Sequence, residues 1–215
     1  MLDSQYWQDL DAISGTAQGR GTTWFIQYNQ QDWVLRHYYR GGMIGKVNKD
    51  KYLFHSLDST RAAREYQLLD HLNQLSLPAP KPIAYRVTRS GPFYQADLIT
   101  EKIADAEDLV ALLSKQSLPD DLWQQIGSTI RAFHNHGIYH HDLNAHNILL
   151  DKHNKVWIID FDRGEQRSIS ESWQQSNLSR LLRSFKKEQR KLNPFNWHNS
   201  NWSAVMSGYQ LADKT

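Results

Sequence analysis

One short part of this chain constrains its fold and its chemistry more than any other. Residues 139–150 read YHHDLNAHNILL and residues 156–162 read VWIIDFD, so Asp142 stands five residues before Asn147, and an apolar run ends on Asp160. In-line phosphoryl transfer from a metal-bound nucleotide needs one carboxylate at the acceptor hydroxyl, and an amide and a second carboxylate at the metal. The order and spacing match the kinase signature. The sequence therefore predicts a kinase.

The motif assigns a role to each polar residue, and Asp142, Asn147 and Asp160 are the candidate catalytic residues. Asp142 is the candidate base, which needs hydrogen-bond reach to the hydroxyl rather than a raised pKa. Asn147 and Asp160 are candidate ligands of Mg²⁺, which prefers oxygen ligands and phosphates. Asp162 replaces the usual glycine of Asp-Phe-Gly and is expected either to join the metal ligands or to pair with Arg163. The alternative is an Asp and an Asn that only cap a turn, and the flanking strand-like segments favour catalysis.

Three glycines upstream are candidate nucleotide contacts. Gly15, Gly19 and Gly21 precede a strand-like run and are predicted to form a phosphate-covering hairpin, because glycine lets backbone amides approach an anion. Their spacing departs from Gly-x-Gly-x-x-Gly, and glycines in a turn are common, so the assignment depends on their place before the other motifs.

The strand lysine that clamps phosphates in kinases is missing from the expected run, which reads WVLR. Arg36 is the candidate replacement, since a guanidinium binds phosphate in bidentate fashion, and Lys46 is the alternative. Glu65, on the next predicted helix, is the natural partner of that cation. Both side chains would otherwise be solvated. Glu101 and Ile103, at the predicted junction of two lobes, complete the candidate nucleotide contacts.

The pattern of apolar residues predicts an α+β fold. A hydrophobic content of 40%, with eight Trp and ten Tyr among 215 residues, is enough for a sizeable core. Strands are predicted within 13–39 and at 83–88, 93–99, 148–150 and 156–159, and helices at 59–69, from 118 to 136 and over most of the remainder. We predict a protein-kinase-like, two-lobed fold: a β-rich N-lobe (1–100), a minimal helical C-lobe (101–215) and an active site in the cleft.

Bulk properties exclude several classes of protein. The net charge of +2 is too small for a chain that coats nucleic acid, and the absence of cysteine excludes disulfides, thiolate metal sites and a cysteine nucleophile. The N-terminus lacks the pattern of a signal peptide, and no apolar run is long enough to span a bilayer. Any membrane contact is therefore expected to be peripheral.

Five histidines near the motif raise the alternative of a His–Asp metal-dependent phosphohydrolase. Such a site takes several histidines from helices, whereas His141 precedes Asp142 in a turn, so the kinase interpretation is favoured. We expect His140 to brace the loop, and His141 and His146 to face the cleft or solvent. His134 and His136, at a helix end, are expected to be solvated or capping.

Cations gather in two segments. The first runs from Arg36 to Lys51, where contact with an anionic ligand is favoured. The second is a predicted helix whose cations are Arg180, Arg183, Lys186, Lys187, Arg190 and Lys191. Its basic face is either a solvated surface or an attraction site for an anionic substrate or membrane, and both interpretations stay open.

Four strings carry a resemblance to a known family: VLRHYYRGG at 34–42, YHHDLNAHNI at 139–148, IDFDRG at 159–164 and NLSRLLRS at 177–184. They resemble the 3-deoxy-D-manno-octulosonic acid (Kdo) kinases. The resemblance implies transfer of phosphate from ATP, with Mg²⁺, to a Kdo hydroxyl (the 4-position) on a lipid A precursor in lipopolysaccharide biosynthesis. It also implies a peripheral protein at the cytoplasmic face of a Gram-negative inner membrane. No nucleic-acid partner is expected, and the oligomeric state stays open.

Several relatives and one non-enzyme remain as alternatives. About fifty residues follow Asp162 and no Ala-Pro-Glu occurs, which is too little for a full protein-kinase lobe. Lipopolysaccharide core heptose kinases share the layout, as do short atypical protein kinases of the tRNA-modification complex. Aminoglycoside- and choline-type phosphotransferases are longer and acidic around the acceptor, which the charge of this chain contradicts. The missing lysine and the altered Asp-Phe-Gly are compatible with a pseudokinase that only binds nucleotide.

Overall fold

The computed structural model describes residues 2–18, 22–40 and 49–212 of the chain. These residues fall into two compact units, the first within residues 1–71 and 80–104 and the second within residues 72–79 and 105–215. Within the described ranges, no helix is both long enough and apolar enough to cross a membrane.

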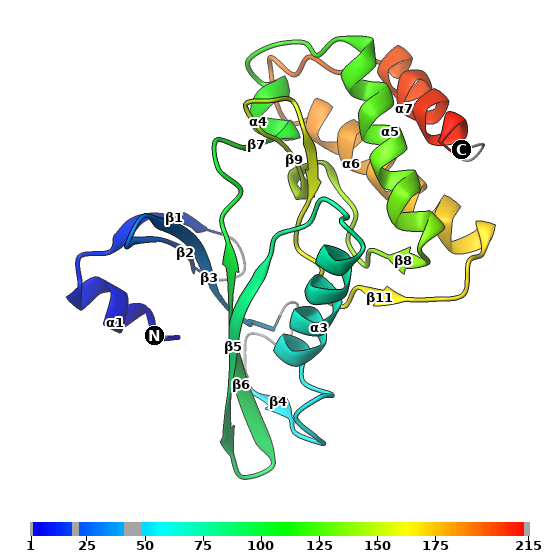
Figure 1. The fold of residues 1–215 in the computed structure, drawn as a ribbon. Helices are drawn as coiled ribbons and strands as arrows, with labels where there is room; N and C mark the ends of the chain where they lie inside the picture. Colours follow the sequence, from blue (N-terminus) through cyan, green and yellow to red (C-terminus); the bar gives the residue numbers. More distant parts are fainter. Residues whose placement is uncertain (1, 19–21, 41–48, 213–215) are drawn as a thin grey trace. The chain divides into compact units, whose positions relative to one another are not determined.

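The first unit is built on a six-stranded antiparallel sheet. Its strands follow the order β1-β2-β3-β6-β4, and β5 also pairs with β6. Its elements are α1 (Ser4–Asp9), β1 (Ile13–Gln18), β2 (Thr22–Tyr28), β3 (Gln31–His37), β4 (Tyr52–Leu53), α3 (Arg61–Gln74), β5 (Pro82–Ser90) and β6 (Phe93–Glu101). Figure 1 shows α3 beside the long β5–β6 pair. The helix is held there by contacts such as Tyr66 against Tyr85, whose ring centroids are 5.2 Å apart.

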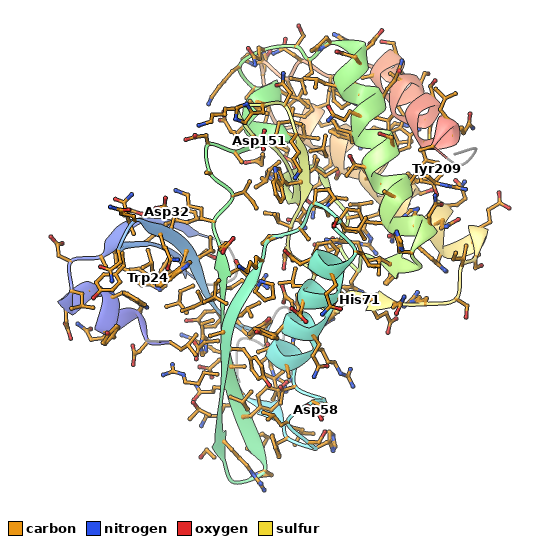
Figure 2. The ribbon with its side chains drawn as sticks, in the orientation of Figure 1. Trp24, Asp32, Asp58, His71, Asp151 and Tyr209 are labelled. Carbon is orange, nitrogen blue, oxygen red and sulfur yellow. The ribbon has the colours of Figure 1, made fainter. Side chains whose placement is uncertain are left out.

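Local sequence explains the short hairpin between β2 and β3. Tyr28 pairs with Gln31, so only Asn29 and Gln30 form the turn between β2 and β3. Both turn residues have positive φ, 49° and 61°, as a two-residue turn that matches strand twist requires. The two polar residues that follow the turn, Gln31 and Asp32, already belong to β3. Figure 2 shows Asp32 just after this turn and Trp24 on β2.

A hydrophobic cluster that contains two tryptophans packs α1 against the sheet. Trp7 of α1 is 1% exposed and packs edge-on against Trp33 of β3, with centroids 5.7 Å apart. The cluster also includes Ala12, Ile26, Leu35 and Ile99. Asp3 caps α1 by accepting a hydrogen bond from the backbone of Gln5.

The second unit combines helices with two small sheets, β10-β9-β7 and β11-β8. Its elements are β7 (Glu107–Asp108), α4 (Leu109–Leu113), α5 (Asp120–Asn135), β8 (Ile138–Tyr139), the 3-10 turn η1 (Ala145–Asn147), β9 (Ile148–Leu150), β10 (Val156–Ile158), β11 (Glu165–Gln166), α6 (Glu171–Gln189) and α7 (Asn199–Leu211). Asp151, in the turn after β9, accepts hydrogen bonds from two backbone amides and the Trp157 indole, which fixes the β9–β10 hairpin (Figure 2).

Helices α5 and α7 pack with their backbones in close contact (Figure 1). A Cβ atom on Gly127 would lie 1.9 Å from the carbonyl oxygen of Val205, and one on Gly208 would lie 1.9 Å from that of Gln124. Each helix therefore carries a glycine at the crossing because any side chain would push the two apart.

Residues 72–79 differ from the predicted division at residue 100, which placed them in the N-lobe. They belong to the second unit, where the backbone of Ile158 donates to the carbonyl of Pro78 at 3.0 Å. Leu77 and Ala79 are buried. The end of α3 and the following apolar segment therefore extend the core beside β10.

Candidate active site

The loop between β8 and β9 brings Asp142 and Asn147 into direct contact. The side-chain amide of Asn147 donates to the carbonyl oxygen of Asp142 at 2.9 Å, and Asn144 donates to the same oxygen at 3.0 Å. Asn147 is buried, whereas 46% of the Asp142 side chain is exposed. The loop thus has a rigid backbone and presents one accessible carboxylate.

His140 braces this loop, as predicted, and the contacts fix its protonation. Its Nδ1 accepts from the backbone of Asp142 at 3.1 Å, so Nε2 carries the proton and donates to the carbonyl of Ile159 at 2.9 Å. Burial lowers the pKa of the ring, in line with a neutral imidazole. One neutral histidine therefore links the loop to the segment that precedes Asp160.

A second contact places Asp160 next to the same loop. The backbone of Ile159 donates to the carbonyl of Asn147 at 2.9 Å. Asp160 has a φ of 61°, a left-handed conformation that is costly for a non-glycine residue and is concentrated at functional sites. The buried ring of Phe161 holds it there, 4.8 Å from the His140 ring and stacked on Phe133. Asp142, Asn147 and Asp160 are thus gathered by main-chain contacts.

Asp162 lies in the turn that follows. Gly164 donates to the carbonyl of Phe161 at 2.7 Å, which makes Asp162 and Arg163 the central residues of the turn, and Arg163 has a φ of 60°. Among the described residues, no group of three or more His, Cys, Asp or Glu side chains forms a metal site. A kinase-type site needs no such group, because phosphates and water supply most of the Mg²⁺ ligands.

The donor set suits Mg²⁺. Since the amide nitrogen of Asn147 is held by Asp142, its side-chain oxygen is the atom left to ligate a cation. Asp160 adds a carboxylate oxygen one residue beyond the contact between Asn147 and Ile159. The predicted ligands Asn147 and Asp160 therefore fit the metal chemically, and the role of Asp162 stays a prediction.

Helix α6 supports the loop with residues that the motif did not identify. The amide of Asn177 accepts from the backbone nitrogen of His140 at 3.2 Å and donates to its carbonyl at 3.0 Å. Arg180 lies 3.6 Å from the Asp142 carboxylate, and Ser184 accepts from the backbone of Ala145 at 3.0 Å. All three lie in the string NLSRLLRS at 177–184, which carries the family resemblance, but neither this string nor their spacing of three and four residues assigned them to the loop.

His146 is exposed, as expected, and pairs with two acidic groups. Its Nδ1 lies 3.5 Å from Asp108 and its Nε2 lies 3.9 Å from Glu188. The hydrogen bond to Asp108 raises the pKa of His146, whereas burial and the nearby guanidinium groups of Arg163 and Arg180 lower that of His141.

The prediction for His134 is wrong. Its side chain is buried beneath α7, and Nδ1 lies 2.8 Å from the hydroxyl of Tyr209. Burial lowers its pKa to about 4. The last turn of α5 faces α7 rather than solvent, which the helix-end pattern could not reveal. Only its neighbour His136 is exposed.

In the first unit, Arg36 and Glu65 form the predicted pair. Arg36 donates from Nη2 to Oε1 of Glu65, and the hydroxyl of Tyr38 donates to Oε2 at 2.6 Å. Glu65 is 3% exposed, so its carboxylate needs these donors. Burial, and then the negative charge of Glu65, raises the pKa of Tyr38 well above its usual range. Arg36 of β3 and Glu65 of α3 are therefore in direct contact, and the role of this pair in nucleotide binding stays a prediction.

The structure says less about the other residues that were predicted to contact the nucleotide. Gly15 lies within β1 opposite Phe25 rather than in a loop. Gly19, Gly21 and Lys46 lie outside the described residues. Glu101 ends β6, and its backbone donates to the carbonyl of Lys81 at 2.8 Å; the half-buried Ile103 follows it.

With this geometry in place, the chain can be compared with known proteins. Residues 4–209 match the model of the lipopolysaccharide kinase (Kdo/WaaP) family. The chain belongs to this family. This match confirms the family that the sequence resembles and the predicted kinase-like α+β fold. The chain is therefore a phosphotransferase with a hydroxyl acceptor, rather than a phosphohydrolase or a binding module.

Curated relatives match this chain over nearly its whole length. It is 45% identical to the 3-deoxy-D-manno-octulosonic acid kinase of Vibrio parahaemolyticus over 99% of this chain and 89% of the relative. The corresponding kinase of Haemophilus influenzae (strain PittEE) is 46% identical over 97% and 89%. The solved structure of the Cydia pomonella granulovirus kinase PK-1 is similar with a TM-score of 0.49 and 16% identity, over 76% of this chain and 56% of that one.

Proposed function

We propose that this protein transfers the γ-phosphate of ATP to a hydroxyl of Kdo, the 4-hydroxyl, on a lipid A precursor during lipopolysaccharide biosynthesis. The observation that carries the proposal is the hydrogen bonding around the loop between β8 and β9. The side chain of Asn147 donates to the backbone of Asp142, and Asp160 directly follows Ile159, whose backbone donates to the carbonyl of Asn147. The names of relatives 45–46% identical over nearly the whole chain support Kdo as the acceptor sugar.

Asp142 is the proposed base. Its carboxylate is the accessible group of an otherwise hydrogen-bonded loop, so it can accept the proton of the acceptor hydroxyl as that oxygen attacks phosphorus. The neutral His140 keeps the loop in place without adding a charge. Its ring links the position of Asp142 to that of Asp160, so base and metal ligand are oriented together.

Asn147 and Asp160 are the proposed ligands of Mg²⁺, with Asp162 as a further candidate. When bound, the metal would neutralise charge on the nucleotide phosphates. The two residues offer one amide and one carboxylate oxygen. The hydrogen bonds from Asn147 to Asp142 and from Ile159 to Asn147 restrict the directions in which those oxygens can lie.

For the nucleotide, we propose that Arg36 takes the place of the kinase lysine and that Glu65 orients it. The Glu65 carboxylate, which also accepts from the Tyr38 hydroxyl, limits the rotamers of the Arg36 side chain. The guanidinium is therefore held in one orientation, which favours bidentate binding of phosphate. Gly15, Gly19 and Gly21 are proposed to approach the phosphates, and the backbone around Glu101 and Ile103 to contact the base.

We propose that the protein works at the cytoplasmic face of the inner membrane as a peripheral protein. The acceptor is a lipid, and the exposed cations of α6 can be attracted by anionic headgroups or by the acceptor itself.

The test is transfer of labelled phosphate from Mg-ATP to Kdo-bearing lipid A precursor, with heptosylated core and a generic protein as parallel acceptors. Label on the Kdo lipid, absent in Asp142→Asn, is the expected result. Nuclear magnetic resonance of the product then identifies the hydroxyl. Label on heptosylated core alone would keep the kinase activity and reject Kdo as the acceptor.

A further inference from the structure

Helix α6 carries a concave cationic surface beyond its contacts with the catalytic loop. A hollow of about 640 Å³ is lined by five residues, all of them cationic: Arg183, Lys186, Lys187, Arg190 and Lys191. We call this feature the α6 hollow. All five side chains are exposed. A surface of this kind attracts a partner with several negative charges.

Two of the three lysines of the hollow lie near one buried carboxylate. Glu188 is 6% exposed, and its Oε1 lies 3.8 Å from Lys187 and 3.4 Å from Lys191. Arg183, Lys186 and Arg190 form no ion pair with any residue in the described part of the chain. Three cations are thus available to an external anion, while two are pre-positioned by Glu188.

The hollow is joined to the candidate base through a single rigid element. Asn177, Arg180 and Ser184 of α6 contact the loop, and the hollow begins at Arg183 on the adjoining face of the same helix. A helix rises 1.5 Å per residue, so Lys187 lies about 10 Å from Arg180 along the axis, and Arg190 and Lys191 directly follow the end of the helix at Gln189. An anion bound in the hollow would therefore be kept at a set distance from Asp142.

We infer that the α6 hollow binds the phosphate groups of the lipid-borne acceptor and so positions its sugar hydroxyl at Asp142. The inference rests on the proposed function and adds the binding site for the acceptor. The hollow is lined mostly by the aliphatic stems of these side chains rather than by their charged ends. The cations begin at Arg183, one turn after Arg180, which contacts Asp142, so they lie where the phosphates of a molecule bound at Asp142 can meet several donors, whereas attraction of bulk anionic lipid needs no cations beside this loop. The acceptor itself is therefore favoured over bulk anionic lipid.

The test compares two triple variants that lose the same positive charge. Arg183→Gln, Lys186→Gln and Arg190→Gln together empty the hollow of its unpaired cations. Lys115→Gln, Lys152→Gln and Lys155→Gln, all exposed on the same unit, form the matched control. Acceptors are presented in non-ionic detergent micelles as Kdo-bearing lipid A precursor, with its phosphates intact or removed.

The hollow variant should show a KM for the phosphorylated acceptor raised about tenfold or more, with kcat little changed. Parent and hollow variant should have the same KM for the dephosphorylated acceptor, and the control variant should match the parent on both. Added salt should raise the parental KM for the phosphorylated acceptor only. An unchanged unfolding temperature would confirm that the exposed substitutions leave the fold intact.

Three results would overturn the inference. These are an unchanged KM in the hollow variant, an equal rise in the control variant, or loss of binding to phosphatidylglycerol vesicles with a parental KM in micelles. The last would make the hollow a membrane contact. If the parent transfers no phosphate to any acceptor, the proposed function fails. Direct binding of the two micelle-borne glycolipids then still tests the hollow, because only the phosphorylated one should bind more weakly to the hollow variant.

Discussion

The carboxylate of Asp142 and the guanidinium of Arg180 form an ion pair between the catalytic loop and α6, with Oδ1 3.6 Å from Nη1. Nearly half of each side chain is exposed, so solvent screens the pair, and its contribution to stability is small. Its effect is to orient the candidate base. Asn177 and Ser184 fix the backbone of the same loop from the same helix. Helix α6 is thus a positioning element for the site.

Arg180→Gln should lower kcat about fivefold, because an exposed ion pair is worth about 1 kcal/mol or less and its loss frees the Asp142 carboxylate to rotate. The KM for ATP should not change. Arg180→Lys, which keeps a cation at this position, should recover most of the activity. Steady-state kinetics with both substrates varied would check this. A parental kcat in Arg180→Gln would remove the positioning role.

Asn177→Ala should destabilise the protein by about 2–3 kcal/mol, because the buried backbone N–H and C=O of His140 would each lose their partner. Chemical denaturation would measure the loss, and kcat should fall with it because His140 supports the loop. Ser179→Ala, on the exposed side of α6, is the matched control and should leave both quantities unchanged. Equal stability of the two variants would contradict the proposed clamp.

The gathering of Asp142, Asn147 and Asp160 at one loop was predictable from sequence because they are close along the chain, while their catalytic roles stay predictions. Asp142, Asn147 and Asp160 lie within nineteen residues, and each was found next to the same loop. Asn177 was not predictable as part of the site. Its contact with His140 spans 37 residues, and nothing in the composition of α6 indicates which polar residue faces the loop.

The same limit explains the error at His134. A histidine near a helix end usually lies in solvent, but this one is covered by α7, which is more than sixty residues further along the chain. The roles of Gly127 and Gly208 could not be predicted from the sequence either. Each looks like a helix defect until the close contact of the two backbones is known.

Tyr38→Phe should raise the KM for ATP by a few-fold with little change in kcat. The hydroxyl of Tyr38 donates to the Glu65 carboxylate, and without it Glu65 would hold Arg36 less firmly. Arg36→Gln should have a larger effect on the same KM, since it removes the proposed phosphate contact itself. Nucleotide titration of both variants would check the order. A larger effect in Tyr38→Phe would mean that Arg36 only stabilises Glu65.

Gly127→Ala should destabilise the protein by several kcal/mol, because the new methyl would overlap the Val205 carbonyl and force α5 and α7 apart. Gly91→Ala is a useful contrast. It meets nothing within 4 Å but has a φ of +59°, so only backbone strain of about 1 kcal/mol is expected. Thermal unfolding of the two variants would rank them, and a higher Tm for Gly127→Ala than for Gly91→Ala would contradict the close packing.

Stability should fall as the pH drops from about 6.5 to about 4, in part because of His134. Burial lowers the pKa of this ring to about 4 in the folded protein, against 6.5 for the unfolded chain. Between these values the unfolded state binds a proton that the folded state does not, so acid favours unfolding by up to about 3 kcal/mol from this residue. Well above pH 6.5 the ring is neutral in both states and contributes no pH dependence.

His134→Gln isolates this contribution, because glutamine can still form a hydrogen bond with Tyr209 but does not titrate. The unfolding free energy of the variant, measured by denaturant titration at several pH values, should fall less steeply between pH 6.5 and 4 than that of the parent. If His134→Gln kept the parental slope, His134 would have to titrate with the same pKa in the folded and unfolded states, and burial beneath α7 would not lower its pKa.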